Sequence, residues 1–551
     1  MCDLRLVSCL EKVFADSAPS YPFYAPEGLR GEEVFFQLSW KNEVSDARTL
    51  VNLKIESEIS GLIRAERVRF VPVLYPTIPG ADDDYLRKTP GLYPDLLEPI
   101  GDSRLRAYGD HWESAWITIS PTEELKAGSY PIRLSLVTDE GEELGAVETN
   151  YTLTDAALPE QKLIHTRWFH CDGLCRYYNV RMFSEKFWRI CESFMRAAVR
   201  MSVNCLLTPV HTPPLDTRVG GERLTCQLVD IEKEGDSYAF GFEKLERWIR
   251  LAQECGIKYF EIAHLFTQWG AAHAPKIVAL ENGAKKKIFG WDTDAGSPEY
   301  VAFLKQYLKA LKKELKKLGV LDKCFFHISD EPNLAQLESY RRARESVKKE
   351  LKGLNCIDAL SNLDFYREGL VEKPVCATNH IRPFLDEKVA GLWAYYCIGQ
   401  HTDVSNVFVA MPSQRTRIIG TQLYKYGIEG FLQWGFNFYN SQYSLYPVNP
   451  YETTDGDGFS PAGDCFIVYP GKDGQAYDSL RARLVRQAVN DLRAFEKLEQ
   501  YIGKEAVVSL IEEDVSPIEF DRYPRDAEYL LKLRHKVNSL IAKYASHEAK
   551  A

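Results

Sequence analysis

The stretch that decides the fold is KCFFHISDEPNLAQLES, residues 323–339. Its apolar run, residues 324–328, predicts a buried strand, and Pro332 followed by an amphipathic pattern predicts a helix. Asp330 and Glu331 stand between these two elements. Two adjacent carboxylates at the end of a buried strand are costly, because ionised groups resist leaving water. A helix N-terminus that favours acids and proline accounts for one of them, so the other indicates a function.

The same succession of strand and helix repeats along residues 162–450. Candidate strands are LIHTRWFH (163–170), VNCLLTPV (203–210), IKYFEIAHL (257–265), KCFFHIS (323–329), NCIDALSN (355–362), PVCATN (374–379), LWAYYCI (392–398) and IEGFLQWGF (428–436). Amphipathic segments lie between most of them, and several end in a glycine suited to a helix C-cap. Eight strands that alternate with helices predict a (β/α)8 barrel of the TIM type. A doubly wound sheet is disfavoured because no glycine-rich phosphate loop follows the first strand.

The two flanking regions have different patterns. Residues 1–158 contain short, often alternating strands between turn signals, which predict an N-terminal β-sandwich. Residues 451–551 begin with a polar loop and continue as two amphipathic helices, which we expect to pack on the barrel. We therefore predict a multidomain α/β and β protein with a β-sandwich at 1–158, a catalytic barrel at 162–450 and C-terminal helices within 451–551.

Composition limits the possible partners and the cellular location. The 551 residues are 45% hydrophobic and carry a net charge of -10, which argues against nucleic acid or an anionic membrane as partner. The N-terminus has no basic region typical of a signal peptide, and no apolar run approaches the ~20 residues that span a membrane. The 13 cysteines are scattered, often within apolar segments. Such usage indicates reduced thiols and predicts a cytoplasmic protein.

Polar and aromatic residues follow the predicted strands, where barrel enzymes hold their chemistry. A carbohydrate site has this character, because aromatic faces stack on sugar rings while amides and carboxylates bind hydroxyls. The candidates to line such a site are His211, His264, Gln268, Trp269, Trp393, Tyr395, Tyr396, Trp434 and Asn437. The histidines are also explained as hydrogen-bonded wall residues, and Trp434 as a core residue. His170, Cys171, Asp172 and Cys175 match no standard zinc spacing, so we expect neither a metal nor a cofactor.

The adjacent acids indicate one particular mechanism. Retaining barrel glycosidases commonly place an acid after strand four and a second glutamate after strand seven. The seventh strand here, GLWAYYCIG (391–399), contains no carboxylate. A 2-acetamido group on the sugar removes the need for one, because its carbonyl oxygen can attack the anomeric carbon. Glu331 would then be the general acid and base, with its pKa raised by the neighbouring charge, and Asp330 would orient the acetamido N–H.

Several stretches resemble glycoside hydrolase family 123, the β-N-acetylgalactosaminidases, and the wider group of proteins that shares this catalytic domain. The matching stretches are GLYPDLLEP (91–99), TRWFHCDGL (166–174), LLTPVHTPPLDT (206–217), YFEIAHLFTQWGA (259–271), HISDEP (327–332) and LQWGFNFY (432–439). The resemblance implies a β-sandwich before a barrel, and retaining, exo-acting, acetamido-assisted release of terminal β-GalNAc from a small glycoside or glycan by Asp330 and Glu331. It also implies a tyrosine on the acetamido oxygen, either Tyr395 or Tyr396, and Trp434 as the floor under the sugar.

Two other functions stay open at this point. A retaining glycosidase that acts on a sugar without the acetamido group needs a second carboxylate about 5–5.5 Å from Glu331, and Asp172 and Glu261 are the candidates. A non-catalytic glycan-binding protein would also suit the aromatic content, although binding needs no general acid. The residues do not distinguish GalNAc from GlcNAc.

Overall fold

The computed structural model describes residues 1–101 and 104–548 of the chain, which folds into two compact units. Unit 1 contains Met1–Gln161, His401–Gly427 and Tyr477–Ala551, and unit 2 contains Lys162–Gln400 and Ile428–Ala476. This grouping assigns residues 401–427 and 477–551 to the unit that holds the N-terminal sheets. The domain boundaries expected from the sequence stay a prediction.

Unit 2 is built on a closed barrel of eight parallel strands, which confirms the predicted barrel. In order around the barrel the strands are β11 (Ile164–Arg167), β12 (Cys205–Thr208), β15 (Tyr259–Ile262), β18 (Cys324–Phe326), β19 (Asn355–Leu360), β20 (Lys373–Ala377), β21 (Trp393–Tyr395) and β22 (Gly430–Gln433). Strand β11 closes the barrel on β22, with Ile164 opposite Gly430 and Arg167 opposite Gln433. The carboxyl ends of all eight strands therefore meet at one face.

Large side chains fill the inside of this barrel. Trp393 is fully buried, and its ring packs edge-to-face on Phe325 with centroids 4.9 Å apart. Gly430 lies directly against the same indole, because a Cβ added there would come 2.1 Å from Trp393 Cδ2. Glycine at this position lets one large ring occupy the centre, so the barrel is a packed core and not a pore.

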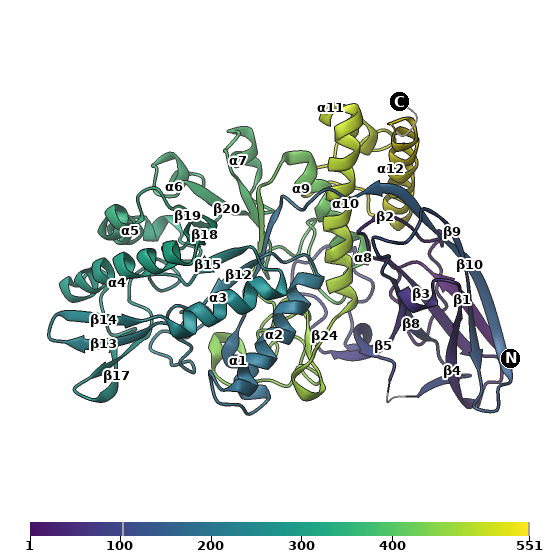
Figure 1. The fold of residues 1–551 in the computed structure, drawn as a ribbon, viewed down its shortest axis with the longest axis horizontal. Coiled ribbons are helices and arrows are strands. Elements are labelled where there is room, and N and C mark those ends of the chain that lie inside the picture. Colours follow the sequence, from purple (N-terminus) through teal and green to yellow (C-terminus); the bar gives the residue numbers. More distant parts are fainter. Residues whose placement is uncertain (102–103, 549–551) are drawn as a thin grey trace. The chain divides into compact units, whose positions relative to one another are not determined.

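Helices and a small extra sheet surround the barrel strands of unit 2. The helices are α1 (Cys171–Tyr177), α2 (Glu185–Arg200), α3 (Glu243–Cys255), α4 (Pro298–Lys317), α5 (Leu337–Leu351), α6 (Asp364–Arg367) and α7 (Arg382–Asp386). Figure 1 shows α3, α4 and α5 along the outside of the strands. The extra sheet, unforeseen from the sequence, consists of β13 (Asp230–Glu234), β14 (Ser237–Gly241), β16 (Ile277–Glu281) and β17 (Ala284–Phe289). Short 3-10 turns include η2 (Leu321–Lys323), η3 (Leu334–Gln336), η4 (Gln442–Ser444) and η5 (Lys472–Gly474).

Unit 1 contains two five-stranded sheets. One has the order β1 (Cys2–Val7), β3 (Val34–Asn42), β8 (Glu113–Ile119), β5 (Ile63–Val73) and β6 (Gly91–Pro99). The other has the order β2 (Glu27–Arg30), β10 (Glu143–Ala157), β9 (Gly128–Val137), β4 (Arg48–Glu56) and β7 (Leu105–Tyr108). Side chains of both sheets, such as Phe36, Ile117, Leu134 and Leu153, belong to one apolar cluster. The β-rich character is as expected, and the sandwich arrangement stays a prediction.

The helices of unit 1 come from the later parts of the chain. They are α8 (Ser413–Arg417), α9 (Ile419–Tyr426), α10 (Leu480–Ile502), α11 (Lys504–Ile511) and α12 (Ala527–Glu548), with a 3-10 turn η1 at Ser60–Leu62. Strands β23 (Tyr469–Pro470) and β24 (Ala476–Tyr477) lie where the chain passes from unit 2 to unit 1. A buried ion pair joins Arg481 of α10 to Asp95 of β6 at 2.8 Å. Within the described ranges, no helix is both long enough and apolar enough to cross a membrane.

Candidate active site

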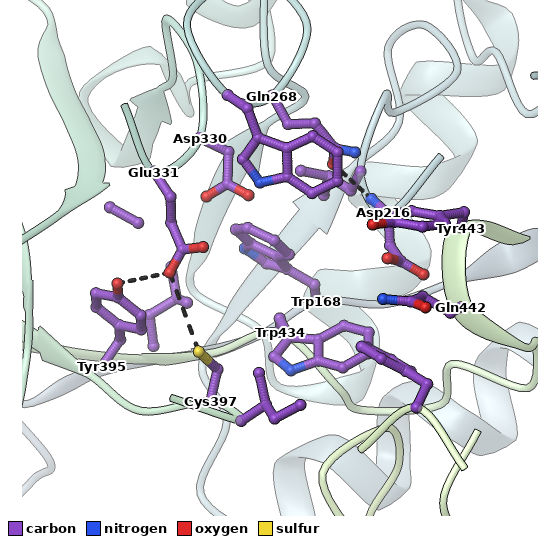
Figure 2. Close-up of a pocket in the computed structure, with 16 residues that line it drawn as sticks. Trp168, Asp216, Gln268, Asp330, Glu331, Tyr395, Cys397, Trp434, Gln442 and Tyr443 are labelled. Atoms are coloured by element: carbon purple, nitrogen blue, oxygen red, sulfur yellow. Dashed lines mark hydrogen bonds between the residues drawn. The ribbon is translucent and has the colours of Figure 1, made fainter. Parts of the chain in front are cut away.

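Asp330 and Glu331 follow β18 at the carboxyl end of the barrel. Glu331 has a φ of 42°, in the left-handed region that residues other than glycine seldom adopt. Neighbouring loops hold this conformation, because the Glu331 N–H donates to the Ala359 carbonyl at 3.1 Å and the Asp330 carbonyl accepts from the Trp269 N–H at 2.9 Å. The turn aims both carboxylates into one cavity (Figure 2). Such strain persists where the surroundings fix it, as at functional sites.

The environment of the two acids favours their protonated forms. Burial raises the pKa of Glu331, while the hydroxyl of Tyr395, which donates to Glu331 Oε1 at 2.6 Å, lowers it. Burial and the charge of Glu331 raise the pKa of Asp330, which is only 9% exposed. Two neighbouring carboxylates at such a site cannot both ionise easily, so the pair holds a proton at a pH where a free carboxyl has lost it.

A buried cation lies next to this pair. His327 Nε2 is 2.6 Å from Glu261 Oε1, and its Nδ1 is 3.2 Å from Asp358 Oδ1. Burial lowers the pKa of His327, but the hydrogen bonds to the two carboxylates outweigh it and raise the pKa to about 9. The imidazolium in turn lowers the pKa of Asp330 and so opposes the effect of Glu331. The charges of Asp358 and Glu261 act the other way, so the pKa of Asp330 stays raised despite the nearby imidazolium.

Aromatic rings make up much of the cavity wall. The cavity has a volume of about 170 Å³. Its aromatic lining consists of Trp168, Trp269, Tyr395, Trp434, Tyr443 and Phe459. Trp168 and Trp434 are anchored through their indole N–H groups, which donate to Glu261 at 2.7 Å and to Asp464 at 3.2 Å. Anchored aromatic rings of this kind are suited to stacking on a pyranose face.

A second, more open cleft of about 650 Å³ begins on the other side of Glu331. Glu331 and Tyr395 line both cavities, whereas Asp330 lines only the smaller one. Neutral polar groups of Asn333, Ser361 and Asn362 also line the cleft. Glu331 therefore stands at the boundary between the smaller cavity and the more open cleft.

Comparison with known proteins assigns the family. A profile described as Glycoside hydrolase 123, catalytic domain, matches residues 168–498. The chain belongs to glycoside hydrolase family 123. No curated protein matches the chain significantly.

Solved structures show how far the family fold extends. A family 123 glycoside hydrolase from Clostridium perfringens, studied for glycolipid glycan hydrolysis, is 15% identical with a TM-score of 0.74 and 99% of each chain covered. A β-glucuronidase from Parabacteroides merdae is 12% identical, with a TM-score of 0.30 over 86% of this chain and 50% of that one. A β-D-mannosidase from Dictyoglomus thermophilum is 13% identical, with a TM-score of 0.26 over 89% of this chain and 55% of that one. The first likeness shows that the fold of this family 123 chain extends over nearly its whole length.

The structure brings together part of the predicted site. Of the predicted residues, Gln268, Trp269, Asp330, Glu331, Tyr395 and Trp434 line the cavity, whereas His211, His264, Trp393, Tyr396 and Asn437 do not. Of the two candidate tyrosines, Tyr395 therefore lines the cavity and Tyr396 does not. The Tyr396 hydroxyl accepts a hydrogen bond from Arg167 at 3.3 Å, and its ring packs on Phe431. The Asn437 amide binds the backbone of His170, accepting at 2.8 Å and donating at 3.2 Å.

The two predicted histidines lie behind the cavity wall of this family 123 site. His264 stacks on His327 with ring centroids 4.0 Å apart, and neither of its ring nitrogens has a hydrogen-bond partner within the described part of the chain. Burial and the charge of His327 lower the pKa of His264 well below its ordinary value. His211 Nε2 lies 2.8 Å from the His264 carbonyl, and burial lowers the pKa of His211 to about 4. Both are neutral packing residues around the charged His327.

Other lining residues were missing from the predicted site. They are Trp168, Leu215, Asp216, Ala359, Cys397, Ile398, Leu432, Gln442, Tyr443 and Phe459. Trp168 and Cys397 lie in the last residues of the predicted strands 163–170 and 392–398, and Asp216 lies in the loop after the predicted strand 203–210, so position at a strand end was the signal that could have found them. Gln442, Tyr443 and Phe459 come from the long loop after β22, where no strand end marks them. No group of three or more His, Cys, Asp or Glu side chains among residues 1–101 and 104–548 is placed to hold a metal ion.

Proposed function

We propose that this family 123 chain is an exo-acting, retaining β-N-acetylgalactosaminidase that uses the acetamido group of its substrate as the nucleophile. The observation that carries the proposal is the pair Asp330 and Glu331, which are adjacent in sequence and both line the same cavity of about 170 Å³. A distant nucleophile is unnecessary if the substrate supplies its own, and an orienting acid beside the general acid is then what the chemistry requires.

Glu331 is suited to the proton transfers. In the first step its carboxylic acid donates a proton to the glycosidic oxygen while the acetamido carbonyl oxygen bonds to the anomeric carbon and the bond to the leaving group breaks. In the second step the Glu331 carboxylate takes a proton from water, and the water oxygen attacks the anomeric carbon and reopens the oxazolinium ring. Two inversions give overall retention. The raised pKa of Glu331 supports its role as acid, because burial favours the protonated form that the first step uses.

Asp330 is suited to hold the acetamido nitrogen. The oxazolinium ion carries positive charge that spreads onto this nitrogen, and an anionic carboxylate stabilises it in a water-poor site. The imidazolium of His327 favours the ionised form of Asp330. The first step needs the one proton of the pair on Glu331 and the negative charge on Asp330, and an acetamido N–H that donates to Asp330 would favour this distribution.

The sizes of the two cavities support exo-action. The smaller cavity, about 170 Å³, accepts one terminal sugar, and the open cleft beyond Glu331, about 650 Å³, leaves room for a larger leaving group. The relative from Clostridium perfringens was studied for glycolipid glycan hydrolysis, which supports a glycan as the substrate here too. The preference for β-GalNAc and a cytoplasmic location are part of the proposal.

The alternative glycosidase mechanism lacks a supporting observation. Its sequence-based candidates for a second carboxylate, Asp172 and Glu261, do not line the cavity. Asp172 forms a buried ion pair with Arg223 at 2.6 Å, and Glu261 is engaged with His327 and Trp168. A purely glycan-binding protein would have no use for two buried acids with raised pKa values.

The test compares chromogenic β-glycosides that differ only at C2 and C4. We expect turnover of β-GalNAc, slower turnover of β-GlcNAc, and a kcat/KM for β-galactoside that is lower by about 1000-fold or more, since its 2-hydroxyl cannot replace the intramolecular acetamido nucleophile. GalNAc-thiazoline, an analogue of the oxazolinium ion, should inhibit competitively. Equal rates on β-galactoside and β-GalNAc, or the absence of inhibition by the thiazoline, would remove the acetamido mechanism. The anomer first released, read by NMR, should be β.

A further inference from the structure

Asp216 is a cavity-lining acid to which the proposed reaction assigns no task. It lies after β12, with a φ of 38° in the left-handed region. Its backbone holds the loop in place: the N–H donates to Gln268 Oε1 at 2.6 Å, and the carbonyl accepts from the Ser444 hydroxyl at 2.8 Å. Both of these hydrogen bonds are made by the main chain of Asp216 and not by its carboxylate.

One oxygen of the Asp216 carboxylate is left without a hydrogen-bond donor in the part of the chain that the structure describes. Its Oδ2 atom is buried and has no hydrogen-bond partner within the described residues. Burial raises the pKa of Asp216 to about 6, although Arg223 and the Tyr443 backbone N–H lower it. A buried oxygen without a donor is costly, and the fold gains nothing visible in return. The missing donor is readily explained as a hydroxyl of the ligand.

The position of Asp216 in the cavity indicates which hydroxyl this is. Figure 2 shows Asp216 beside Tyr443 and Gln442 on the side of the cavity opposite Glu331, with Trp168 and Trp434 between the two sides. Asp330 stands next to Glu331, on the side of the cavity that faces Asp216. In a pyranose ring C2 is next to C1, whereas C4 lies across the ring from C1. A sugar with C1 at Glu331 and its C2 substituent at Asp330 therefore directs C4 toward Asp216.

We propose that Asp216 accepts a hydrogen bond from the 4-hydroxyl of the bound sugar and thereby selects between the two epimers at this carbon. The proposal rests on the proposed function, because that function sets the orientation of the ring. The carboxylate has two oxygens, and the buried Oδ2 is the one that lacks a donor. The 4-hydroxyl is the group whose axial or equatorial placement distinguishes GalNAc from GlcNAc, so a fixed acceptor at this point favours one epimer.

The backbone geometry determines the choice of variants. Asp216→Gly removes the carboxylate and tolerates the positive φ, because glycine adopts this region without strain. Asp216→Asn keeps the shape and a neutral acceptor, and asparagine is also common at positive φ. Both variants should melt at or above the temperature of the unchanged chain, because they remove a poorly satisfied buried charge. This readout separates loss of binding from loss of folding.

The experiment is a double-mutant cycle in which one change is made in the substrate. Chromogenic β-GalNAc and its 4-deoxy and 6-deoxy analogues are assayed with the unchanged chain and with both variants. We expect Asp216→Gly to lower kcat/KM for β-GalNAc by about 10- to 100-fold, as for hydrogen bonds to charged groups, and to lower it hardly at all for the 4-deoxy sugar. Asp216→Asn should lower kcat/KM for β-GalNAc by a smaller factor than Asp216→Gly. The 6-deoxy sugar is the matched control: Asp216→Gly should lower kcat/KM for it by the same factor as for β-GalNAc.

The outcomes separate this proposal from the function on which it rests. If β-GalNAc is hydrolysed but Asp216→Gly lowers kcat/KM equally for the parent and the 4-deoxy sugar, the role of Asp216 is wrong while the function stands. An equal, large loss on every substrate together with release of the α-anomer would make Asp216 a general base of an inverting enzyme, and would overturn both. If no β-N-acetylhexosaminide is hydrolysed and GalNAc-thiazoline does not bind, as measured by calorimetry, both proposals fail.

Discussion

The hydroxyl of Tyr395 donates to Glu331 Oε1 at 2.6 Å across a separation of 64 residues in the sequence. The contact joins the last residue of β21 to the loop after β18. It fixes the orientation of the acid and favours its ionised form, while burial favours the protonated form. The two opposing effects set the pKa at which Glu331 can both give and take a proton.

Tyr395→Phe should therefore change the pH dependence as well as the rate. Without the hydroxyl, burial alone acts on Glu331 and its pKa rises further. The protonated acid then persists to higher pH, so the basic limb of kcat/KM against pH should move upward, with a loss of about 10- to 100-fold at the optimum. Tyr396→Phe is the matched control, since Tyr396 does not line the cavity. An unmoved basic limb in Tyr395→Phe would contradict this account of the contact.

Glu331→Gln and Asp330→Asn should differ in their dependence on the leaving group. A general acid matters most when the leaving group is basic, so Glu331→Gln should lose about 100- to 10,000-fold on alkyl or sugar leaving groups and much less on dinitrophenyl glycosides. Asp330→Asn should lose activity on all of them, because every leaving group requires the oxazolinium ion. The measurement is a plot of log kcat/KM against the pKa of the leaving group; parallel plots for the two variants would refute the division of roles.

Asp330 should lower the stability of the fold at neutral pH. Its pKa is raised in the folded chain, so the unfolded carboxyl, with a pKa of about 3.9, loses its proton first as the pH rises. The free energy of unfolding therefore falls above about pH 4 and stays low beyond the folded pKa. Asp330→Asn should raise the free energy of unfolding by about 1–3 kcal/mol at pH 7.5 and little at pH 4. Denaturant unfolding at both pH values checks this, and equal effects would speak against a buried charge.

His327, in contrast to Asp330, should stabilise the fold through its charged form. Its folded pKa, about 9, exceeds the ordinary histidine value, so its stabilisation is fully present below about pH 6.5 and is lost as the pH rises through 9. Removing one member of a buried ion pair costs about 3–5 kcal/mol, and His327→Gln should show this loss at pH 6 but a clearly smaller one at pH 10. His264→Gln is the matched control: His264 is neutral over this range, so its effect should not depend on pH.

Local patterns sufficed to predict the barrel and the two acids. Each barrel strand is a short buried apolar run. An abrupt change from apolar to charged residues, as between Phe326 and Asp330, marks the end of such a strand. The extra sheet of β13, β14, β16 and β17 was missed because its strands are polar and partly exposed. Such strands have no alternating apolar signal, and their pairing depends on contacts that only the folded loops provide.

The candidate site was harder to predict than the barrel. Position after a strand does not say whether a side chain turns to the cavity or to the packing behind it, so Tyr395 and Tyr396 looked equivalent. Likewise His264 follows a strand, as Asp216 does, yet only Asp216 lines the cavity. Gln442 and Tyr443 reach it from a 3-10 turn with positive φ at Tyr443 and Ser444, and no propensity predicts two such residues in succession.

The path of the chain between β21 and β22 limits how the two units can evolve. The chain leaves unit 2 after Gln400, passes through His401–Gly427 of unit 1, and returns at Ile428 to supply the strand that closes the barrel. Residues 451–476 then bring Asp464, which holds Trp434. No single cut in the gene separates a complete barrel from the rest of the protein. Recombination that exchanges contiguous segments would break both units, so the two are expected to descend and diversify together.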